Sequence, residues 1–323
     1  MSDAFKWCFI GTGRLANQVA AQITASGRHE IVSVHAHSLE KGQAFAAQYG
    51  GVAYGDTAAA ITADGVQGVY IVTPHDSHGD YVRQAIMLGK SVLCEKPFTT
   101  DAAIAEELLS LAEEKGVYVA EAMWTWFAPV ANQVKRWLDD GAFGELRELS
   151  ASYCVNISAR GGRLTDPARA GGALLDIGIY PITYLYRLFG MPVKVDCRGT
   201  VEGGVDMGEE IDLTFADGRT HHISVSMCDA DGGETLRILG SEASLELDGF
   251  HYASRVGLAR CDGSSEVFEG DGSLLNEFDR ASEEMRAGKT ESAYVPHRAT
   301  LDVLRIMDEC RRQMGLVYPF ERK

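Results

Sequence analysis

The sequence predicts an α/β protein with two domains: a doubly wound parallel sheet, followed by an α+β domain with a large, mostly antiparallel open sheet. In residues 1–121, short β-branched runs alternate with helical segments, which is typical of a parallel sheet covered by helices. In residues 122–323, long runs of alternating polarity follow one another through short turns, which is typical of antiparallel strands. The chain has 323 residues, of which 46% are hydrophobic, so each domain can build a core.

The first domain is expected to begin with a strand over Lys6–Gly11 and a helix in which Leu15, Val19 and Ile23 recur at helical spacing. Strands and helices then alternate, and right-handed crossovers make the sheet doubly wound. The further strands expected are Glu30–Ala36, Gly68–Pro74, Ser91–Pro97 and Val117–Trp124. The further helices expected are Ser38–Gly50, Asp76–Gly89 and Thr100–Lys115.

The second domain is expected to open with a helix over Pro129–Gly141, followed by a long strand over Glu145–Ile157 and an apolar helix over Gly171–Phe189. A series of alternating runs then predicts an antiparallel sheet. Its strands are expected at Val193–Val201, Glu209–Ala216, Arg219–Met227, Glu234–Gly240, Ala243–Gly249 and Gly257–Cys261. Two helices, Leu274–Ala287 and His297–Met314, are expected to end the chain.

Composition excludes several classes of protein. The net charge of −16 argues against a nucleic-acid partner, which would need a basic surface. The N-terminus lacks the pattern of a signal peptide, and the most apolar stretch contains Asp176, Pro181 and Arg187, so no membrane association is expected. The seven cysteines are scattered and form no CxxC pair, which predicts reduced thiols in a cytoplasmic protein rather than disulfides or a metal site.

The motif GTGRLA directly follows the first expected strand and opens the first helix. Its first glycine permits the tight turn, its second allows the backbone to approach a pyrophosphate, and the helix N-terminus offers free N–H groups. Two glycines at such a corner can also merely make a turn, but the alternating units behind them favour a dinucleotide-binding Rossmann domain. We assign to cofactor binding Gly11, Thr12, Gly13, Arg14 and Leu15.

The end of the second strand lacks the acidic residue that would hold the ribose of NAD. His37, Ser38 and Lys41, together with Arg14, are placed to meet a 2′-phosphate instead. The alternative is that they are ordinary exposed loop residues. The sequence therefore favours NADP as the cofactor, with NAD as the alternative.

Two further strand ends carry polar residues, at the edge where open α/β sheets bind ligands. Thr73, Pro74 and His75 are expected to line the nicotinamide end of the cleft; His78 joins them unless it only begins the next helix. No third ligand accompanies the two histidines, so no metal site is expected.

At the next strand end, Glu95 and Lys96 are assigned to the same crevice. The ammonium of Lys96 would hold substrate hydroxyls or assist a neighbouring proton donor. The alternative is a solvated corner shaped by Pro97.

Asp176 and Tyr180 are four residues apart, so on a helix they would share a face. A lone tyrosine in an apolar helix is usually part of the core. A carboxylate beside it is less easily explained in that way, because burying an unpaired charge is costly. An Asp176–Tyr180 face opposite Lys96 would form a set of groups for proton transfer.

The stretches GTGRLA, TPHDSH, GKSVLCEKP, RLTDPARAGGALLDIGIYPI and QMGLVYPFE together resemble the Gfo/Idh/MocA oxidoreductases along nearly the whole chain. The branch they resemble most comprises the dimeric dihydrodiol dehydrogenases and the NADP-dependent D-xylose dehydrogenases. That branch has a tyrosine, here Tyr180, where the inositol dehydrogenase branch has a histidine.

The resemblance implies Lys96 in the site, Asp176 orienting substrate or Lys96, and Tyr180 as the general acid/base. It also implies hydride transfer to or from a sugar, polyol or diol, and a second domain that binds substrate and whose sheet forms a homodimer or higher oligomer. Hydride chemistry on this fold is also used for sugar–sugar oxidoreduction or glycoside cleavage. A non-catalytic dinucleotide sensor is a further alternative, although a sensor would need no proton donor.

One residue departs from the branch: an arginine is typical where Trp126 stands. Trp124, Trp126 and Phe127 would form either an apolar wall for substrate or part of an interdomain core. Arg160 and Arg163, in the loop before the apolar helix, are candidates for contacting substrate oxygens or for a surface role.

Overall fold

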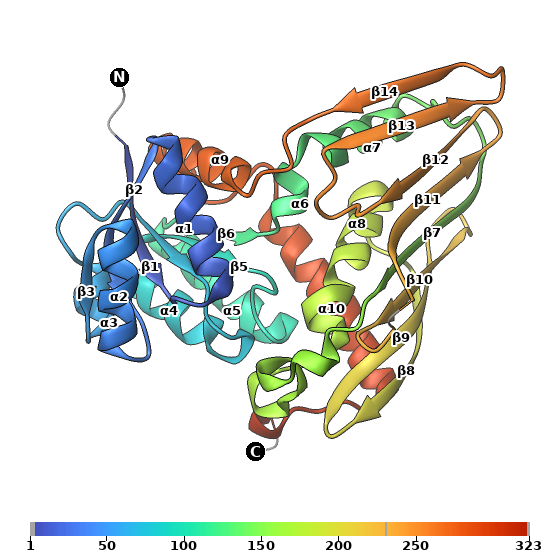
Figure 1. The fold of residues 1–323 in the computed structure, drawn as a ribbon. Helices are drawn as coiled ribbons and strands as arrows, with labels where there is room; N and C mark the ends of the chain where they lie inside the picture. The colour runs from blue at the N-terminus through green and yellow to red at the C-terminus, as the bar shows by residue number, and fades with distance from the viewer. Residues whose placement is uncertain (1–3, 230, 322–323) are drawn as a thin grey trace. The chain divides into compact units, whose positions relative to one another are not determined.

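The computed structural model describes residues 4–229 and 231–321, which form two compact units (Figure 1). The first unit extends to Trp124 and also includes Leu274–Thr300. The second comprises Thr125–Ser273 and the described residues from Leu301 onward. The predicted partition at residue 121 did not anticipate that a late segment of the chain belongs to the first unit.

The first unit contains one six-stranded sheet. Its strands are β1 (Phe5–Ile10), β2 (His29–His35), β3 (Val52–Tyr54), β4 (Gly68–Ile71), β5 (Ser91–Glu95) and β6 (Val119–Ala122). All pairings are parallel, and the strand order is β3-β2-β1-β4-β5-β6. This order confirms the predicted doubly wound sheet, whose ligand-binding edge lies at the carboxyl ends of the strands.

Helices connect these strands. They are α1 (Arg14–Ser26), α2 (Leu39–Tyr49), α3 (Thr57–Ile61), α4 (His78–Met87) and α5 (Ala102–Lys115), with a 3-10 turn at His75–Ser77. The sequence analysis missed β3 and α3, because three- and five-residue elements are too short to show a periodic pattern.

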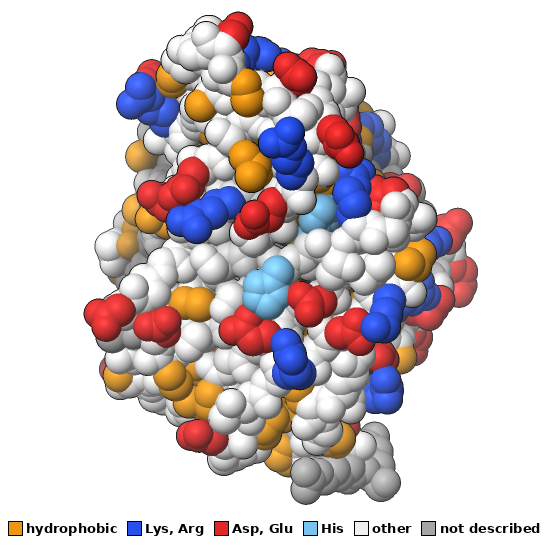
Figure 2. All heavy atoms as spheres, turned by 90° about the vertical axis from the view of Figure 1, so that its right-hand side faces the viewer, with side chains coloured by type: hydrophobic (Ala, Val, Ile, Leu, Met, Phe, Trp, Pro, Cys, Tyr) orange, Lys and Arg blue, Asp and Glu red, His pale blue; other side chains and the backbone are white. Residues whose placement is uncertain are grey.

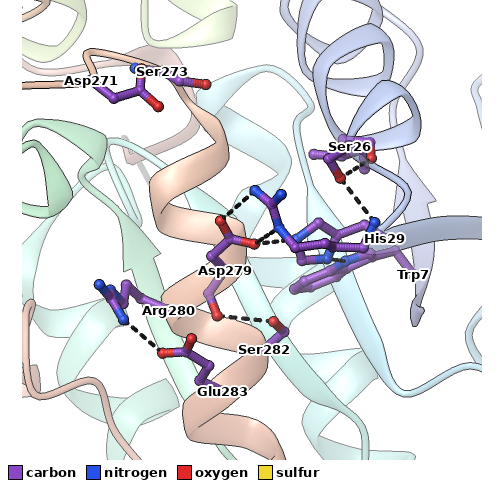
Figure 3. A network of polar contacts seen from close by, with 11 residues as sticks. Trp7, Ser26, His29, Asp271, Ser273, Asp279, Arg280, Ser282 and Glu283 are labelled. Atoms are coloured by element: carbon purple, nitrogen blue, oxygen red, sulfur yellow. Dashed lines mark hydrogen bonds and ion pairs between the residues drawn. The ribbon is translucent and has the colours of Figure 1, made fainter. Parts of the chain in front are cut away.

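Helix α9 (Leu275–Arg286) follows the second unit in sequence but packs into the core of the first. The ring of Phe278 lies 5.1 Å from that of Trp7 and 4.8 Å from that of Tyr70, measured between centroids. At the surface, Asp279 accepts hydrogen bonds from Arg28 and from His29 Nε2, the latter at 3.0 Å (Figure 3). Apolar burial and these polar contacts together explain why this segment belongs to the first unit.

The second unit contains one eight-stranded sheet. Its strands are β7 (Leu146–Cys154), β8 (Lys194–Glu202), β9 (Val205–Thr214), β10 (Thr220–Ser226), β11 (Glu234–Gly240), β12 (Ala243–Asp248), β13 (Arg255–Arg260) and β14 (Ser265–Glu269). Their order is β14-β13-β12-β11-β7-β10-β9-β8, and every pair except the parallel pair β7–β10 is antiparallel. The predicted mostly antiparallel sheet is confirmed, with β14 as an addition.

One face of this sheet is buried and the other is exposed. Leu213, Ile223 and Leu236 are fully buried, whereas the neighbouring positions on the same strands point to solvent. The exposed face carries acidic, basic and histidine side chains among scattered hydrophobic ones (Figure 2). Such alternation is expected of an antiparallel sheet that is covered on one side only.

The helices of the second unit cover the sheet's apolar face. They are α6 (Trp124–Phe127), α7 (Pro129–Asp139), α8 (Ile179–Phe189) and α10 (His297–Met314), of which α6 and α10 begin in the first unit. The predicted helix over Gly171–Phe189 is a π-helical turn, Leu174–Gly178, continued by α8. Within the described parts of the chain, no helix is long and apolar enough to span a bilayer.

Candidate active site

The glycine turn lies between β1 and α1. Gly11 has φ of +110°, and a Cβ atom there would lie 2.5 Å from the carbonyl oxygen of Val72, so this position accepts glycine alone. Gly13 is the N-cap residue that precedes α1, and a Cβ atom there would meet nothing within 4 Å. No side chain caps the helix, so its first N–H groups are available to an anion in the open space over Gly13. Thr12 and Leu15 are half-buried beside Gly13, and Arg14 is exposed.

The loop after β2 carries the residues predicted to meet a 2′-phosphate. His37 and Lys41 are exposed, while Ser38 caps α2 by accepting a hydrogen bond from the Lys41 backbone N–H. The preceding His35 is buried, with ring nitrogens 3.2 Å from the Tyr54 carbonyl and 3.1 Å from the Thr57 hydroxyl. The loop therefore presents the exposed side chains of His37 and Lys41. No carboxylate stands at the end of β2, where it would hold the ribose of NAD.

The loop after β4 holds the next group of predicted residues. His75 is buried in the short 3-10 turn, and the Ser77 hydroxyl lies 2.8 Å from the Pro74 carbonyl oxygen and 2.9 Å from the Thr73 hydroxyl. His78 opens α4 and is fully buried, with its ring nitrogens 2.8 Å from the Pro97 carbonyl and 2.9 Å from the Thr73 carbonyl. Burial lowers the pKa of His78. The neutral ring has one N–H, so it donates to one of these two carbonyls, that of Pro97 or that of Thr73.

The corner after β5 contains Glu95 and Lys96, and the Lys96–Pro97 peptide bond is cis. Glu95 is buried and accepts hydrogen bonds from the Tyr70 hydroxyl at 2.6 Å and from the Lys96 backbone N–H at 3.3 Å. Burial raises the pKa of Tyr70, and the Glu95 charge raises it further. Glu95 thus fixes the backbone on which Lys96, which is partly exposed, is mounted.

Two more carboxyl groups belong to this corner, and the sequence analysis missed both. Glu121 in β6 accepts from the Phe98 backbone N–H at 2.9 Å and from the Thr300 hydroxyl at 3.0 Å. Burial raises the pKa of Glu121 to about 7. Glu277 in α9 is fully buried, and burial, reinforced by the Glu95 charge, raises its pKa well above the ordinary value. Both causes disfavour a second buried negative charge on Glu277 beside that of Glu95.

In the second unit, Asp176 lies in the π-helical turn and Tyr180 in the first turn of α8. Both side chains are largely buried, and Asp176 accepts a hydrogen bond from the Arg163 guanidinium at 3.0 Å. The structure thus gives Arg163 a defined partner, whereas Arg160 is exposed. A π-helical turn is rare and is found mostly where side chains have functional positions.

The start of this π-helical turn is held by Asp206, a buried residue of β9 that the sequence analysis did not single out. Its Oδ2 atom accepts from the Leu174 backbone N–H at 2.5 Å. Gly172 has φ of +125°, and a Cβ atom there would lie 2.0 Å from Asp206 Oδ1. Burial, followed by the Asp206 charge, raises the pKa of neighbouring Glu209 well above its ordinary value.

The ring of Tyr180 packs against two side chains that no sequence motif connected to it. The His251 ring lies 4.8 Å from it and the Tyr153 ring 5.9 Å, between centroids. His251 is in turn held by Glu234, whose carboxylate is 2.5 Å from Nδ1. These residues lie 71 positions after Tyr180 in one case and 27 before it in the other, so neighbouring sequence could not indicate the contact.

The three aromatic residues of the WTWF segment fall in different surroundings. Trp124 packs against the core of the first unit, while Trp126 and Phe127 are buried in the second. The Trp126 ring stacks on Tyr186, with 6.2 Å between centroids, and the Arg187 guanidinium lies 5.1 Å from its centre. A cation therefore lies over the face of the Trp126 ring, within the distance of a cation–π interaction.

No group of three or more His, Cys, Asp or Glu side chains in residues 4–229 and 231–321 is arranged to hold a metal ion. The seven cysteines, all within these ranges, form no disulfide.

Comparison with known proteins identifies the family. A family-domain model described as "Oxidoreductase family, NAD-binding Rossmann fold" matches residues 5–123, and the model of the GFO/IDH/MocA C-terminal domain matches residues 131–246. The chain belongs to the Gfo/Idh/MocA oxidoreductases. Its two matched segments correspond to the parallel-sheet unit and to most of the eight-stranded sheet, as the sequence motifs predicted.

The curated relatives of this Gfo/Idh/MocA protein match its whole length. Trans-1,2-dihydrobenzene-1,2-diol dehydrogenase from Mus musculus is 28% identical over 334 residues, which cover 99% of this chain and 100% of the relative. D-xylose 1-dehydrogenase (NADP(+)) from Hypocrea jecorina is 26% identical over 363 residues, covering 97% and 93%. The names of these relatives agree with the predicted branch.

Among solved structures, a 3-ketoreductase from Actinomadura kijaniata in complex with NADP and TDP-benzene superimposes with a TM-score of 0.87. The two chains are 24% identical, and the match covers 96% of this chain and 98% of the other. At this identity the likeness confirms the fold.

Proposed function

We propose that this Gfo/Idh/MocA protein is an NADP-dependent dehydrogenase/reductase. It would transfer hydride between nicotinamide C4 and the hydroxyl- or carbonyl-bearing carbon of a sugar, polyol or diol. Tyr180 would act as the general acid/base and Lys96 would assist it. The observation that carries the proposal is the placement of Tyr180 and Asp176: two polar side chains, largely buried in an apolar helical segment, each held by specific neighbours.

The first unit fits the cofactor. The close approach at Gly11, the uncapped start of α1 and the open space over Gly13 suit a pyrophosphate, while Arg14, His37 and Lys41 suit a 2′-phosphate. NADP is favoured because no acid stands at the end of β2, where it would hold the ribose of NAD, and because the Hypocrea jecorina relative is named for NADP. The remaining residues assigned to the cofactor are Thr12, Leu15, Ser38, Thr73, Pro74, His75, His78 and Glu95. When bound, the cofactor takes up or supplies the hydride.

The protein's own residues handle the proton. In the oxidising direction, the substrate hydroxyl gives its proton to Tyr180, and the Lys96 ammonium stabilises the negative charge that develops on oxygen. A tyrosine has an ordinary pKa of about 10, so a nearby cation helps it to act near neutral pH. Asp176, oriented by Arg163, would position the substrate or Lys96.

The substrate class follows from the relatives, which are named for a dihydrodiol and for D-xylose. Trp124, Trp126, Phe127, Arg160 and Arg163 are proposed to shape its specificity. We further propose that the second unit binds substrate and that the exposed face of its sheet joins a second copy of the chain. Sedimentation of the purified protein would show a monomer if this is wrong.

The experiment is turnover of NADP, and of NAD for comparison, with a panel of aldoses and vicinal diols, followed by the absorbance of the reduced nicotinamide. Lys96→Met and Tyr180→Phe should each abolish turnover while NADP binding is retained. Normal turnover by both variants would refute the mechanism. If the wild type binds NADP but reduces it with no substrate of the panel, the sensor or the sugar–sugar oxidoreductase would be the better interpretation.

A further inference from the structure

The carboxyl groups of Asp206 and Glu209 lie next to each other in the interior of the second unit. Both residues belong to β9, and they are 0% and 2% exposed. Residues three apart on a regular strand point to opposite faces, but the register between β9 and β8 skips Met207. Met207 is therefore the extra residue of a β-bulge, and the bulge turns the side chain of Asp206 to the face of Glu209.

Three oxygen atoms of this pair have no hydrogen-bond donor among the described residues. They are Oδ1 of Asp206 and both carboxyl oxygens of Glu209. Two ionised carboxylates are acceptors only, so no hydrogen bond could form between them, and both charges would be buried without a donor. One proton lowers this cost, because a protonated carboxyl donates to its neighbour. Burial, followed by the Asp206 charge and a hydrogen bond with Asp206, raises the pKa of Glu209 in agreement.

The contacts of Asp206 favour the proton on Glu209. Asp206 Oδ2 accepts from the Leu174 backbone N–H at 2.5 Å, at the start of the helical segment that continues into α8. An ionised carboxylate is favoured at this place, because it meets an N–H group and the positive end of the helix dipole. Neither oxygen of Glu209 meets such a donor among the described residues.

Further titratable groups lie around the pair, and none of those in the described residues donates to its three oxygens. They are Cys154 of β7, Cys197 of β8, Cys310 and Arg311 of α10, and Tyr318 and Glu321 after it. The Tyr318 hydroxyl donates to the Gly171 carbonyl at 3.1 Å, and burial raises its pKa. Arg311 lies 4.6 Å from the centre of the Tyr318 ring and pairs with Glu321 at 2.6 Å. A proton held by the pair itself therefore provides the donor that these oxygens lack.

We propose that Asp206 and Glu209 share one proton at neutral pH, and that Glu209 is a positioning residue for the turn that carries Asp176. Glu209 acts through Asp206, which binds the start of the π-helical turn. Loss of the proton to alkaline solvent places two negative charges side by side, and their repulsion loosens the contact between Asp206 and Leu174. The positioning role rests on the proposed function, in which Asp176 positions the substrate or Lys96, whereas the shared proton does not.

Infrared difference spectroscopy tests the shared proton without substrate or cofactor. A protonated carboxyl has a C=O stretching band that a carboxylate or a glutamine lacks, so the spectrum of the chain minus that of Glu209→Gln should contain this band at neutral pH. Glutamine has nearly the same shape as glutamic acid and keeps an N–H donor toward Asp206. The matched control is Glu202→Gln on neighbouring β8, whose exposed side chain should contribute no such band. A difference spectrum without the band for Glu209 overturns the proposal.

A reciprocal variant shows whether the proton belongs to the pair or to Glu209 alone. Asp206→Asn keeps an oxygen for the Leu174 N–H, offers an N–H to Glu209, and removes the charge that favours protonation of Glu209. The band of Glu209 is followed with rising pH in both backgrounds, each time as the difference from Glu209→Gln. Its titration midpoint should fall by about one pH unit in Asp206→Asn. An unchanged midpoint would assign the proton to the burial of Glu209 alone and overturn the proposal.

Kinetics test the positioning role and separate it from the proposed function. With the best substrate of the panel, Glu209→Leu, which offers Asp206 no donor, should lower kcat/KM about tenfold, whereas Glu209→Gln should retain it. At alkaline pH the wild type should lose activity relative to Glu209→Gln, because the amide donates at every pH; this comparison stands even if leucine prevents folding. An equal loss in both variants, or no loss in either, overturns the positioning role. Undiminished turnover by Tyr180→Phe instead refutes the proposed function and leaves the infrared result unaffected.

Discussion

The two units of the molecule position their candidate site residues in different ways. In the first unit, the residues follow consecutive strands of one parallel sheet, so the topology brings them to the same edge. Gly11 and Lys96 each lie within a residue of a strand end. In the second unit, Asp176 and Tyr180 lie on one helical segment, and side chains distant in sequence define their surroundings.

These distant residues are all polar and largely buried. Asp206 supports the π-helical turn, and Glu234 holds the histidine that packs on Tyr180. The comparison teaches that a site built by main-chain topology can be located from sequence. A site built by buried side-chain pairs depends on contacts that only the folded chain brings together.

The largest effect is expected at Gly11, where the first unit relies on backbone geometry. Gly11→Ala should destabilise this unit by about 3–5 kcal/mol, because its φ disfavours a side chain and Cβ would collide with the Val72 carbonyl. Chemical denaturation measures the loss. Gly13→Ala is the control: a Cβ there meets nothing, so stability should be kept while NADP affinity falls. Equal stability of the two variants would contradict the argument.

The corresponding change in the second unit is Asp206→Ala. It leaves the Leu174 N–H without its acceptor and opens a cavity beside Gly172, so a loss of about 2–4 kcal/mol is expected, together with weaker turnover. Asp212→Ala, on the same strand but with its side chain on the exposed face, should cost less than about 0.5 kcal/mol. A comparable loss of unfolding free energy in the two variants would show that the burial of Asp206 does not cause the effect.

The buried carboxyl Glu121 predicts a pH dependence of stability in the first unit. Its pKa is raised from 4.5 to about 7 in the folded protein, so its contribution is complete below pH 4.5 and lost as the pH rises through 7. Because glutamine does not ionise, Glu121→Gln should reduce the loss of unfolding free energy at rising pH by up to about 3 kcal/mol. Unfolding free energies at several pH values measure it, with exposed Glu113→Gln as control. An unchanged pH dependence in Glu121→Gln would contradict the assignment.

The buried side chain of His221 predicts a pH dependence of stability in the second unit that is smaller than that of Glu121 and has the opposite sign. Burial among Phe189 and Phe215, with help from the Arg219 charge, lowers its pKa from 6.5 to about 4. Its contribution is present above pH 6.5 and lost as the pH falls through 4. His221→Leu should therefore remove about 1–3 kcal/mol of acid sensitivity.

The control for this change is His222→Leu, next along β10. Burial lowers the pKa of His222, but hydrogen bonds to Asp212 and Glu210 raise it overall, so this residue cannot cause a loss of stability in acid. If His222→Leu removed the acid sensitivity and His221→Leu did not, the roles of the two histidines would be reversed.

Much of the fold was predictable because its patterns are local. Alternating strands and helices, the glycine turn and the alternating polarity of β9–β12 each extend over a few residues and predicted the correct sheets. The short elements β3 and α3 carried no periodic pattern and were missed. The amphipathic segment of α9 was predicted as a helix. Its assignment to the first unit was not predictable, because it depends on the packing of Phe278 against Trp7 and Tyr70, which lie about two hundred residues or more earlier in the chain.

By itself, the sequence determined the two sheets, the absence of an acid at the end of β2, and the identity of the motif residues Lys96, Asp176 and Tyr180. The tertiary structure decided which side chains surround them. The Arg163–Asp176 pair, the raised pKa of Glu277 and the hydrogen bonds of Glu234 to His251 all arise from burial and proximity. Short-range patterns encode backbone conformation, whereas charge and protonation depend on neighbours that folding brings together from any part of the chain.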